Sequence, residues 1–298
     1  MHLKQLEAFV YVAKLGSFSK AADAIYLTQP TVSAHIGALE KELGTRLIIR
    51  STKEVYLSPA GKIFYDFAVQ IIRLCDQAVQ EVRSSYTEIA GTLEIVASTV
   101  PSQYILPKIL PGLTSRYPQV FYQVSQYDSG EVVDKIAHNR AEVGIVGALQ
   151  NNENCEFIPF TNDQLVIITP NTEEYQKLQG KMTPAQIKKF PFVTRELGSG
   201  TRKRTEEFLQ SIGIEYRSLN LAAQFQSTES AVQAVKNGVG ISIVSRIAAE
   251  DYHRLGMLLI FDYESIHLKR QFYLVVRKGH PLSPAARFFV DELKNWEK

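Results

Sequence analysis

The sequence predicts an α/β protein in three parts: a winged helix-turn-helix, a long linker helix and a two-lobed domain with mainly parallel sheets. Two short amphipathic helices meet at a turn within residues 17–36. Residues 60–87 contain no Pro and no Gly after Gly61, which favours one long helix. Beyond Gly91, strand-like and helix-like segments alternate, which is typical of parallel sheets. We therefore expect domain bounds at 1–58, 59–90 and 91–298.

The composition is that of an ordinary globular protein. The 298 residues are 45% hydrophobic and 21% charged, with a net charge of +2. Residues 1–58 hold seven Lys and Arg against five Asp and Glu, so this segment alone can account for the positive excess. Affinity for nucleic acid must then depend on where the charges lie and on two copies binding together.

Targeting signals are not indicated by the sequence. Glu7 and Lys14 interrupt the N-terminal apolar stretch, which argues against a signal peptide, and no apolar run approaches the length of a membrane span. Cys75 and Cys155 are far apart and form neither a metal-type pair nor a disulfide framework. We therefore expect a cytoplasmic protein with no membrane partner.

Three helices are expected in the first 45 residues. The first covers residues 3–15, whose apolar side chains share one face, and ends at Gly16. The second is expected to have Ser19 as its N-cap. The third begins at Thr28, with Pro30 in the first turn, where a missing N–H costs nothing. Its predicted buried face consists of Val32, Ile36, Leu39 and Leu43.

The outward face of the third helix is predicted to enter the DNA major groove. The residues on this face are Pro30, Ala34, Gly37, Ala38 and Lys41. Thr31 and Ser33 flank it, and a helix that is small and hydroxylic near its start fits a groove when another helix presents it across a turn. His35 lies beside the buried face, so packing or a phosphate contact is favoured over reading a base.

A short hairpin, the wing, is expected after this helix. Two β-rich runs, 46–50 and 54–57, flank Ser51-Thr52-Lys53. Arg50 and Lys53 lie at the predicted tip, where contacts to DNA phosphates are expected.

The linker helix is predicted to start at Ser58-Pro59 and to pair with a second copy. Its apolar residues follow an alternating three/four spacing close to a heptad seam: Phe64, Phe67, Ile71, Leu74 and Ala78. We favour a dimerisation helix, because the DNA-binding unit before it needs a partner. The alternative is an internal helix of a single bundle.

The remaining chain is expected to form two lobes. Strands are predicted at 93–97, 120–126, 143–147, 165–169, 192–194, 219–226, 240–244 and 272–276, and helices at 103–116, 129–139, 201–212, 228–236 and up to Trp296. The last strand and helix are expected to return to the first sheet. Lobe one then covers about 91–162 and 266–298, and lobe two about 163–265.

Hydroxyl groups follow several of these strands, where ligands bind in parallel sheets. The predicted ligand-site residues are Ser98, Thr99, Ser102, Ser129, Gly147, Ser199 and Thr201, with Ser227 and Thr228 placed similarly. Any one of these hydroxyls can be a plain helix N-cap. Their repeated placement favours a site for a small anion or polar metabolite between the lobes.

No catalytic, metal or cofactor site is predicted. Residues 198–203 resemble a phosphate loop only loosely, and no G-x-S-x-G occurs. The six His are scattered without metal-ligand spacing, and we expect Cys75 and Cys155 to be a packing residue and a loop thiol rather than redox sensors.

Together these residues resemble the LysR family of bacterial transcriptional regulators. The matching N-terminal segments are Phe18-Ser19, Ala21-Ala22, Thr28-Gln29-Pro30-Thr31-Val32-Ser33, Ile36, Leu39-Glu40, Leu43-Gly44, Leu47 with Arg50, and Leu57-Ser58-Pro59-Ala60-Gly61. The resemblance implies a two-lobed effector domain similar to periplasmic binding proteins, dimers or homotetramers on promoter DNA, and a small-molecule co-inducer. RNA polymerase is a further candidate partner.

The resemblance also assigns roles to individual positions. It implies that Gln29, Pro30, Thr31 and Ser33, with Thr28 before them, approach DNA. Ala34 departs from the long polar residue of many members and removes one base contact, while Ile48 replaces the usual Phe in packing. Segments 97–99, 146–148 and 196–202 are similar to members linked to sulfur, selenium or carbon metabolism.

Two other functions are weighed against a ligand-responsive regulator. A solute-binding protein of a transporter would explain the two lobes but not residues 1–90, and an α/β enzyme would need a catalytic motif that is not found.

Overall fold

The computed structural model describes residues 1–50, 55–83, 89–180 and 182–296. The chain divides into two compact units, Met1–Thr87 with His138–Arg140 and Glu88–Ala137 with Ala141–Lys298, and each is described by itself. No helix of the described residues has the length and apolar character needed to cross a membrane.

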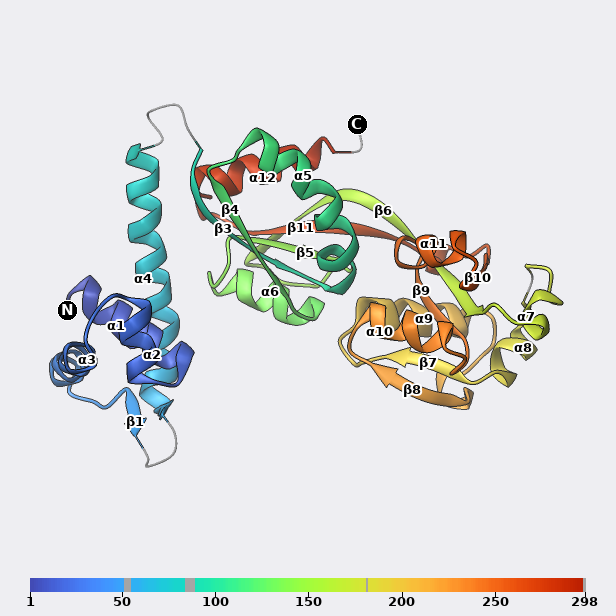
Figure 1. The fold of residues 1–298 in the computed structure, drawn as a ribbon, viewed down its shortest axis with the longest axis horizontal. Helices are drawn as coiled ribbons and strands as arrows, with labels where there is room; N and C mark the ends of the chain where they lie inside the picture. Colours follow the sequence, from blue (N-terminus) through green and yellow to red (C-terminus); the bar gives the residue numbers. More distant parts are fainter. Residues whose placement is uncertain (51–54, 84–88, 181, 297–298) are drawn as a thin grey trace. The chain divides into compact units, whose positions relative to one another are not determined.

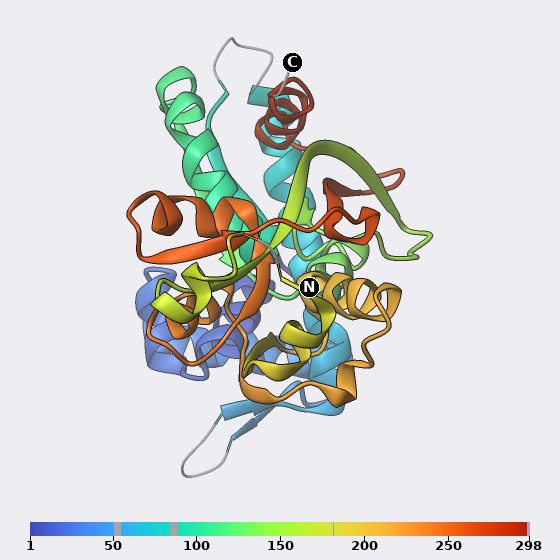
Figure 2. The same ribbon diagram turned by 90° about the vertical axis from the view of Figure 1, so that its right-hand side faces the viewer.

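The N-terminal unit is a helical cluster with a two-stranded hairpin (Figure 1). Its elements are α1 (Leu3–Leu15), α2 (Phe18–Ala24), α3 (Gln29–Leu43), β1 (Ile48–Arg50), β2 (Val55–Leu57) and α4 (Pro59–Arg83). β1 and β2 pair antiparallel and extend away from the helices (Figure 2). Lys53 and the rest of the predicted wing tip lie outside the described residues.

Helix starts in this unit follow the capping chemistry of the sequence, with one correction. The Thr28 hydroxyl accepts a hydrogen bond from the Thr31 N–H, which confirms the predicted start of α3. The predicted cap of α2, Ser19, is wrong. Ser17 has extended backbone angles and its Oγ accepts from the Lys20 N–H, so the helix begins at Phe18.

The core of the N-terminal unit forms where α1, α3 and α4 meet. Val32, Ile36 and Leu39 of α3 are fully buried, as predicted. Leu43, predicted on the same face, is instead 39% exposed, because it lies in the last turn before the left-handed Gly44 that ends the helix.

The start of α4 packs closely on the chain that leads into β1. Ser58 Oγ donates to the Arg46 carbonyl at 2.6 Å and accepts from the Gly61 N–H at 2.9 Å. A Cβ on Gly61 would lie 2.0 Å from the Leu47 carbonyl oxygen, so only glycine fits here.

The predicted seam of α4 divides between two faces. Phe64 and Ile71 pack inward on the core, and the Phe64 ring lies 5.5 Å from that of Phe9. Phe67 and Leu74 are 58% and 60% exposed, and Ile63 joins them at 67%. This exposed apolar stripe of Ile63, Phe67 and Leu74 has no partner within the described chain.

The C-terminal unit consists of two lobes that share the strands crossing between them (Figure 1). Lobe one contains β3 (Gly91–Ala97), η1 (Pro101–Ile105), α5 (Leu106–Arg116), β4 (Val120–Gln126), α6 (Ser129–Ala137), β5 (Val143–Val146) and α12 (Pro284–Lys294). Lobe two contains α7 (Glu173–Gln176), α8 (Pro184–Lys189), β7 (Phe192–Arg195), α9 (Gly200–Ser211), η2 (Tyr216–Ser218), β8 (Leu221–Phe225), α10 (Thr228–Lys236), β9 (Ser242–Ser245), α11 (Arg246–Arg254), β10 (Leu258–Phe261) and η3 (Ile266–Leu268). The crossing strands are β6 (Cys155–Pro170) and β11 (Lys269–Arg277).

The sheets are mixed rather than mainly parallel. β3 lies parallel to both β4 and β5, and β7 lies parallel to β8. The last strand does return to the first sheet, but β11 runs antiparallel to β5 and β6, and β6 pairs antiparallel with β9 and β10. A strand that crosses from one lobe to the other and a second that crosses back must run in opposite directions, which accounts for these antiparallel pairs.

Alternating apolar residues cover both faces of the lobe-one sheet. Leu93, Ile95 and Ala97 of β3 face the side covered by α5 and α12, while Val96 faces α6. This alternation is what a strand buried on both faces requires.

The ladder between β6 and β11 contains an irregularity. Phe272 pairs with Thr161 and Tyr273 with Pro159, so Phe160 is an extra residue in β6. Such a bulge increases the local twist of the strand pair.

Candidate functional site

The start of α3 is exposed in the way the sequence predicts. Gln29, Pro30, Ala34, Gly37, Ala38 and Lys41 are exposed, and Thr31, Ser33 and His35 are half-buried. Thr28 Oγ1 lies 2.8 Å from Thr31 Oγ1, so these two hydroxyls form a hydrogen bond at the start of the helix. The exposed surface is therefore small and polar at one end of the helix.

The hairpin is tied to the same helix by a carboxylate. Glu40 Oε1 accepts from the backbone N–H groups of Leu47 and Ile48, at 2.7 and 3.0 Å. This contact ties the start of β1, which ends at Arg50, to α3.

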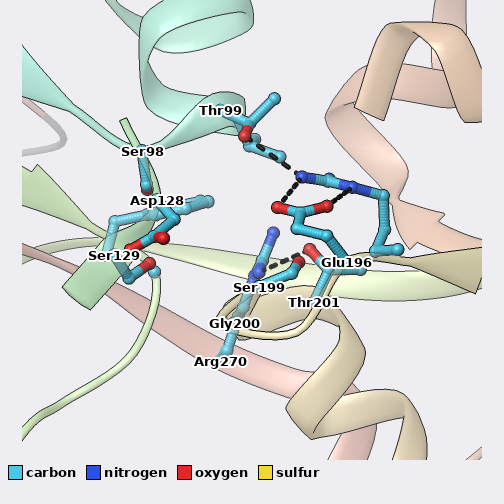
Figure 3. Close-up of a pocket in the computed structure, with 13 residues that line it drawn as sticks. Ser98, Thr99, Asp128, Ser129, Glu196, Ser199, Gly200, Thr201 and Arg270 are labelled. Atoms are coloured by element: carbon cyan, nitrogen blue, oxygen red, sulfur yellow. Dashed lines mark hydrogen bonds and ion pairs between the residues drawn. The ribbon is translucent and has the colours of Figure 1, made fainter. Parts of the chain in front are cut away.

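Between the two lobes a small cavity collects most of the predicted ligand-site residues (Figure 3). Six of the seven line it: Ser98, Thr99, Ser129, Gly147, Ser199 and Thr201. Ser102 does not; its hydroxyl lies within hydrogen-bond distance of two acceptors, the Thr99 carbonyl at 3.0 Å and Gln126 Oε1 at 2.9 Å. Ser227 and Thr228 do not line the cavity either, although Thr228 contacts an arginine that does.

Strand ends and helix starts bring these hydroxyls together. Ser98 and Thr99 follow β3, Gly147 follows the neighbouring β5, and Ser129 begins α6. From lobe two, Ser199 caps α9 by accepting from the Arg202 N–H. A Cβ at Gly147 would lie 3.0 Å from the Phe272 ring and 3.2 Å from Arg270 Nη1, so a larger residue there would press on both side chains.

Two buried arginines, Arg195 and Arg270, complete the cavity, and neither is among the residues predicted from the sequence. Arg195 ends β7, and its Nη2 donates to Thr99 Oγ1 of the other lobe at 3.2 Å. The same guanidinium donates to Thr228 Oγ1 and forms two 2.9 Å bonds with the Glu196 carboxylate. Arg195 thus connects lobe two to the residues that follow β3. The carboxylate of the adjacent Glu196 balances its charge.

Arg270 is held in the cavity by a carboxylate behind it. Its side chain is 3% exposed, and Nε donates to Asp163 Oδ2 at 2.7 Å. Nη1 donates to Thr201 Oγ1 at 3.1 Å. Nη2 also lies 2.7 Å from Asp163 Oδ2 but has no hydrogen bond of good geometry, so a buried donor is left over.

Asp163 itself is fully engaged. Its other oxygen, Oδ1, accepts from Ser245 Oγ at 2.8 Å. Phe272 contributes a ring whose face lies 4.8 Å from the Arg270 guanidinium carbon. Charge, hydrogen bonds and packing therefore all fix the position of Arg270.

A second polar contact joins the lobes beside the cavity. Tyr104, in the π-helical turn η1 of lobe one, donates to Glu229 Oε2 of α10 at 2.5 Å. Gln233 and Tyr252 donate to the other oxygen. Burial raises the pKa of Glu229, but these three hydrogen bonds and the charge of Lys236 outweigh it and lower the pKa below its usual value.

The same contact keeps the phenol neutral. Burial, followed by the hydrogen bond to Glu229, raises the pKa of Tyr104 well above its ordinary value. Gln103 beside it donates to Ser227 Oγ at 3.2 Å, so η1 contacts the start of α10 at two points.

The chemistry of the cavity is that of binding. The described residues that line it include neither His nor Cys, and its hydroxyls and guanidinium groups are donors for an acceptor-rich ligand. Nor do the described residues contain a group of three or more His, Cys, Asp or Glu placed to hold a metal ion.

Comparison with known proteins assigns both units. Residues 3–62 match the family model described as bacterial regulatory helix-turn-helix protein, lysR family, and residues 87–298 match the LysR substrate binding domain. The chain is 34% identical to the HTH-type transcriptional regulator CysL of Bacillus subtilis, over 83% of this chain and 81% of that protein. It is 28% identical to a probable RuBisCO transcriptional regulator of Cyanidioschyzon merolae, over 98% and 97%.

The fold has a close counterpart among solved structures. The crystal structure of full-length CbnR complexed with its target DNA superposes with a TM-score of 0.74 at 20% identity, over 99% of both chains. An identity this low shows the fold alone. The two family matches and the relative at 34% identity show that the chain belongs to the LysR family of ligand-responsive, DNA-binding transcriptional regulators.

Proposed function

We propose that this regulator is a homodimer or homotetramer that binds promoter DNA and responds to a small anionic or polar metabolite in the cavity between its lobes. The observation that supports this proposal is the cavity, which is lined by six of the predicted residues and by Arg270, whose Nη2 is buried without a hydrogen bond. Ligands of this kind bind where strand ends and helix N-termini meet.

For DNA, the proposed contacts come from the start of α3 and from the wing. Thr28, Gln29, Pro30, Thr31 and Ser33 approach the major groove, and Arg50 and Lys53 contact phosphates. With Ala34, Gly37 and Ala38 exposed, direct base contacts are few. Specificity then depends on DNA shape and half-site spacing as well as on base contacts.

Assembly is proposed to use the exposed stripe of α4. A DNA-binding unit of this size reads one half-site, and two copies are needed for a full operator. Ligand binding is proposed to close the lobes, which changes the angle between dimers and hence the bending of DNA, with RNA polymerase as the downstream partner.

The target genes are proposed to belong to sulfur, selenium or carbon metabolism. The relative named as a RuBisCO regulator supports the carbon branch. The genes that flank this one test the assignment, since such regulators commonly lie beside their targets.

One experiment tests the DNA-binding and sensing roles separately. The double variant Thr31→Ala/Ser33→Ala should abolish salt-sensitive binding to the region upstream of the gene, measured by fluorescence anisotropy, while stabilisation by a cavity ligand persists. Loss of both properties would show that the helix is structural. No sequence-dependent binding by the wild type would refute the proposed function.

A further inference from the structure

The charges around the cavity narrow the class of ligand beyond "anionic or polar", and this inference rests on the proposed function. Four charged side chains line the cavity: Arg195, Arg270, Asp128 and Glu196. Asp163 lies directly behind Arg270. With three carboxylates against two guanidinium groups, the side chains around the cavity carry an excess of negative charge.

Neither arginine offers a free countercharge. Arg195 is paired with Glu196 through two hydrogen bonds, and Arg270 is paired with Asp163. A ligand with two negative charges, such as sulfate, would bring its charges next to Asp128 and Glu196 without an unpaired cation to meet them. Such juxtaposition in a partly desolvated cleft is unfavourable.

An acceptor group nevertheless has a place at the Arg270 side. Arg270 Nη2 is buried without a hydrogen bond, and the guanidinium lies next to the start of α9. The first N–H groups of this 12-residue helix, on Gly200 and Thr201, have no partner inside the helix. These donors fit one carboxylate, which accepts several hydrogen bonds at once.

The other side of the cavity offers acceptors instead. Asp128 lies with Ser98 and Ser129 across the cluster from Glu196 and Thr201 (Figure 3). Its Oδ1 accepts from the Glu131 N–H at 2.8 Å, while Oδ2 would lie 3.3 Å from a Cβ on Gly198 of the opposite lobe. Asp128 and Glu196 both also line the adjoining outer cleft, so their carboxylates border the route into the cavity.

We infer that the ligand is a small zwitterion of the α-amino-acid type. Its carboxylate binds Arg270 Nη2 and the N-terminus of α9, and its ammonium group faces Asp128 on the opposite side of the cavity. A zwitterion adds no net charge to the cleft and supplies one donor group and one acceptor group, each to the side that lacks it.

Matched pairs of compounds test this inference on the full-length protein. Each pair differs only in an ammonium or a hydroxyl group: serine and glycerate, alanine and lactate, aspartate and malate. Isothermal titration calorimetry with each of the common amino acids should find at least one that binds. The matching 2-hydroxy acid should bind with an affinity at least about tenfold lower, and inorganic sulfate and phosphate should bind more weakly still.

A charge variant adds a second test. Asp128→Asn keeps the oxygen that caps α6 but removes the charge, so it should weaken binding of the amino acid about tenfold or more and leave binding of the anionic 2-hydroxy acid equal or tighter. Glu131→Gln is the control, since it removes the same charge from the outer cleft, where Glu131 lies. Equal weakening by both variants would contradict a specific contact.

Other outcomes overturn the inference and leave the proposed function standing. These are tighter binding of sulfate, phosphate or a hydroxy acid than of every amino acid, or binding by no amino acid while another anion alters DNA binding. The proposed function fails separately, if the protein shows no sequence-dependent DNA binding at all.

Discussion

Arg270 depends on Thr201 for the only hydrogen bond that its Nη1 makes to a described residue. Thr201→Val removes that acceptor without changing the side-chain volume much, and leaves a second buried donor unpaired. We expect the free energy of unfolding of the C-terminal unit to fall by about 1–3 kcal/mol, measured by urea denaturation. Thr205→Val is the control, because its hydroxyl only donates to the Thr201 carbonyl in the same helix. Equal losses in the two variants would contradict this role for Thr201.

Gly61 gives a second prediction at the scale of a single residue, for the stability of the N-terminal unit. In Gly61→Ala the new methyl group meets the Leu47 carbonyl oxygen, so the N-terminal unit should lose about 1–3 kcal/mol as the chain shifts. Gly37→Ala, with open space around it in the helix interior, should instead gain about 0.5–1 kcal/mol. Thermal unfolding of both variants measures the contrast. A gain in both would show that the approach of α4 to Leu47 is easily relaxed.

The two arginines also show what the sequence could not predict at this scale. Hydroxyls after strands were predictable, because the ends of parallel strands meet at one edge. Arg270 was not, because the carboxylate that makes its burial tolerable, Asp163, is 107 positions away and no local pattern links them. Arg195 was missed for another reason: its bonding partners lie on the strands and helix starts of both lobes.

At the scale of elements, α4 gives a prediction about assembly. Leu74→Glu places a charge in the exposed apolar stripe, where a partner helix would have to desolvate it. We expect the apparent mass in sedimentation to shift from dimer or larger toward monomer. Lys62→Glu, an exposed position near the start of the same helix, serves as the control. An unchanged mass for Leu74→Glu would assign the interface to another surface.

The contact between η1 and α10 predicts an acid sensitivity. The pKa of Glu229 is lowered in the folded protein, so its contribution to stability is present above the unfolded value of 4.5 and is lost as the pH falls below it. Urea denaturation of the wild type should therefore show a steeper loss of stability below pH 4.5 than Glu229→Gln. Identical slopes would show that the Tyr104–Glu229 contact does not depend on the charge.

Element prediction succeeded where periodicity and capping agree, and failed where they do not. The strand at 120–126 and the helix at 228–236 have the predicted bounds, because both are regular and bounded by turn or capping residues. The first half of β6 was missed, since residues 155–164 include Pro159 and polar side chains that resemble a loop. α11 and β10 were also missed.

The whole molecule holds separate hydrophobic cores in its two units. Calorimetry should therefore show two unfolding transitions rather than one. Gly61→Ala should lower the temperature of one transition and leave the other in place, and Thr201→Val should do the reverse. A single transition that both variants shift would mean that the units unfold as one.

The paired strands β6 and β11 have a mechanical consequence for the C-terminal unit. They are hydrogen-bonded to each other along the crossing, so the lobes are connected by a ribbon and not by two independent tethers. A ribbon resists stretching and shear but yields to torsion, and the unpaired Phe160 is where its ladder is weakest. Any change in the angle between the lobes therefore has to twist or bend this ribbon as one body, and cannot move one of its strands alone.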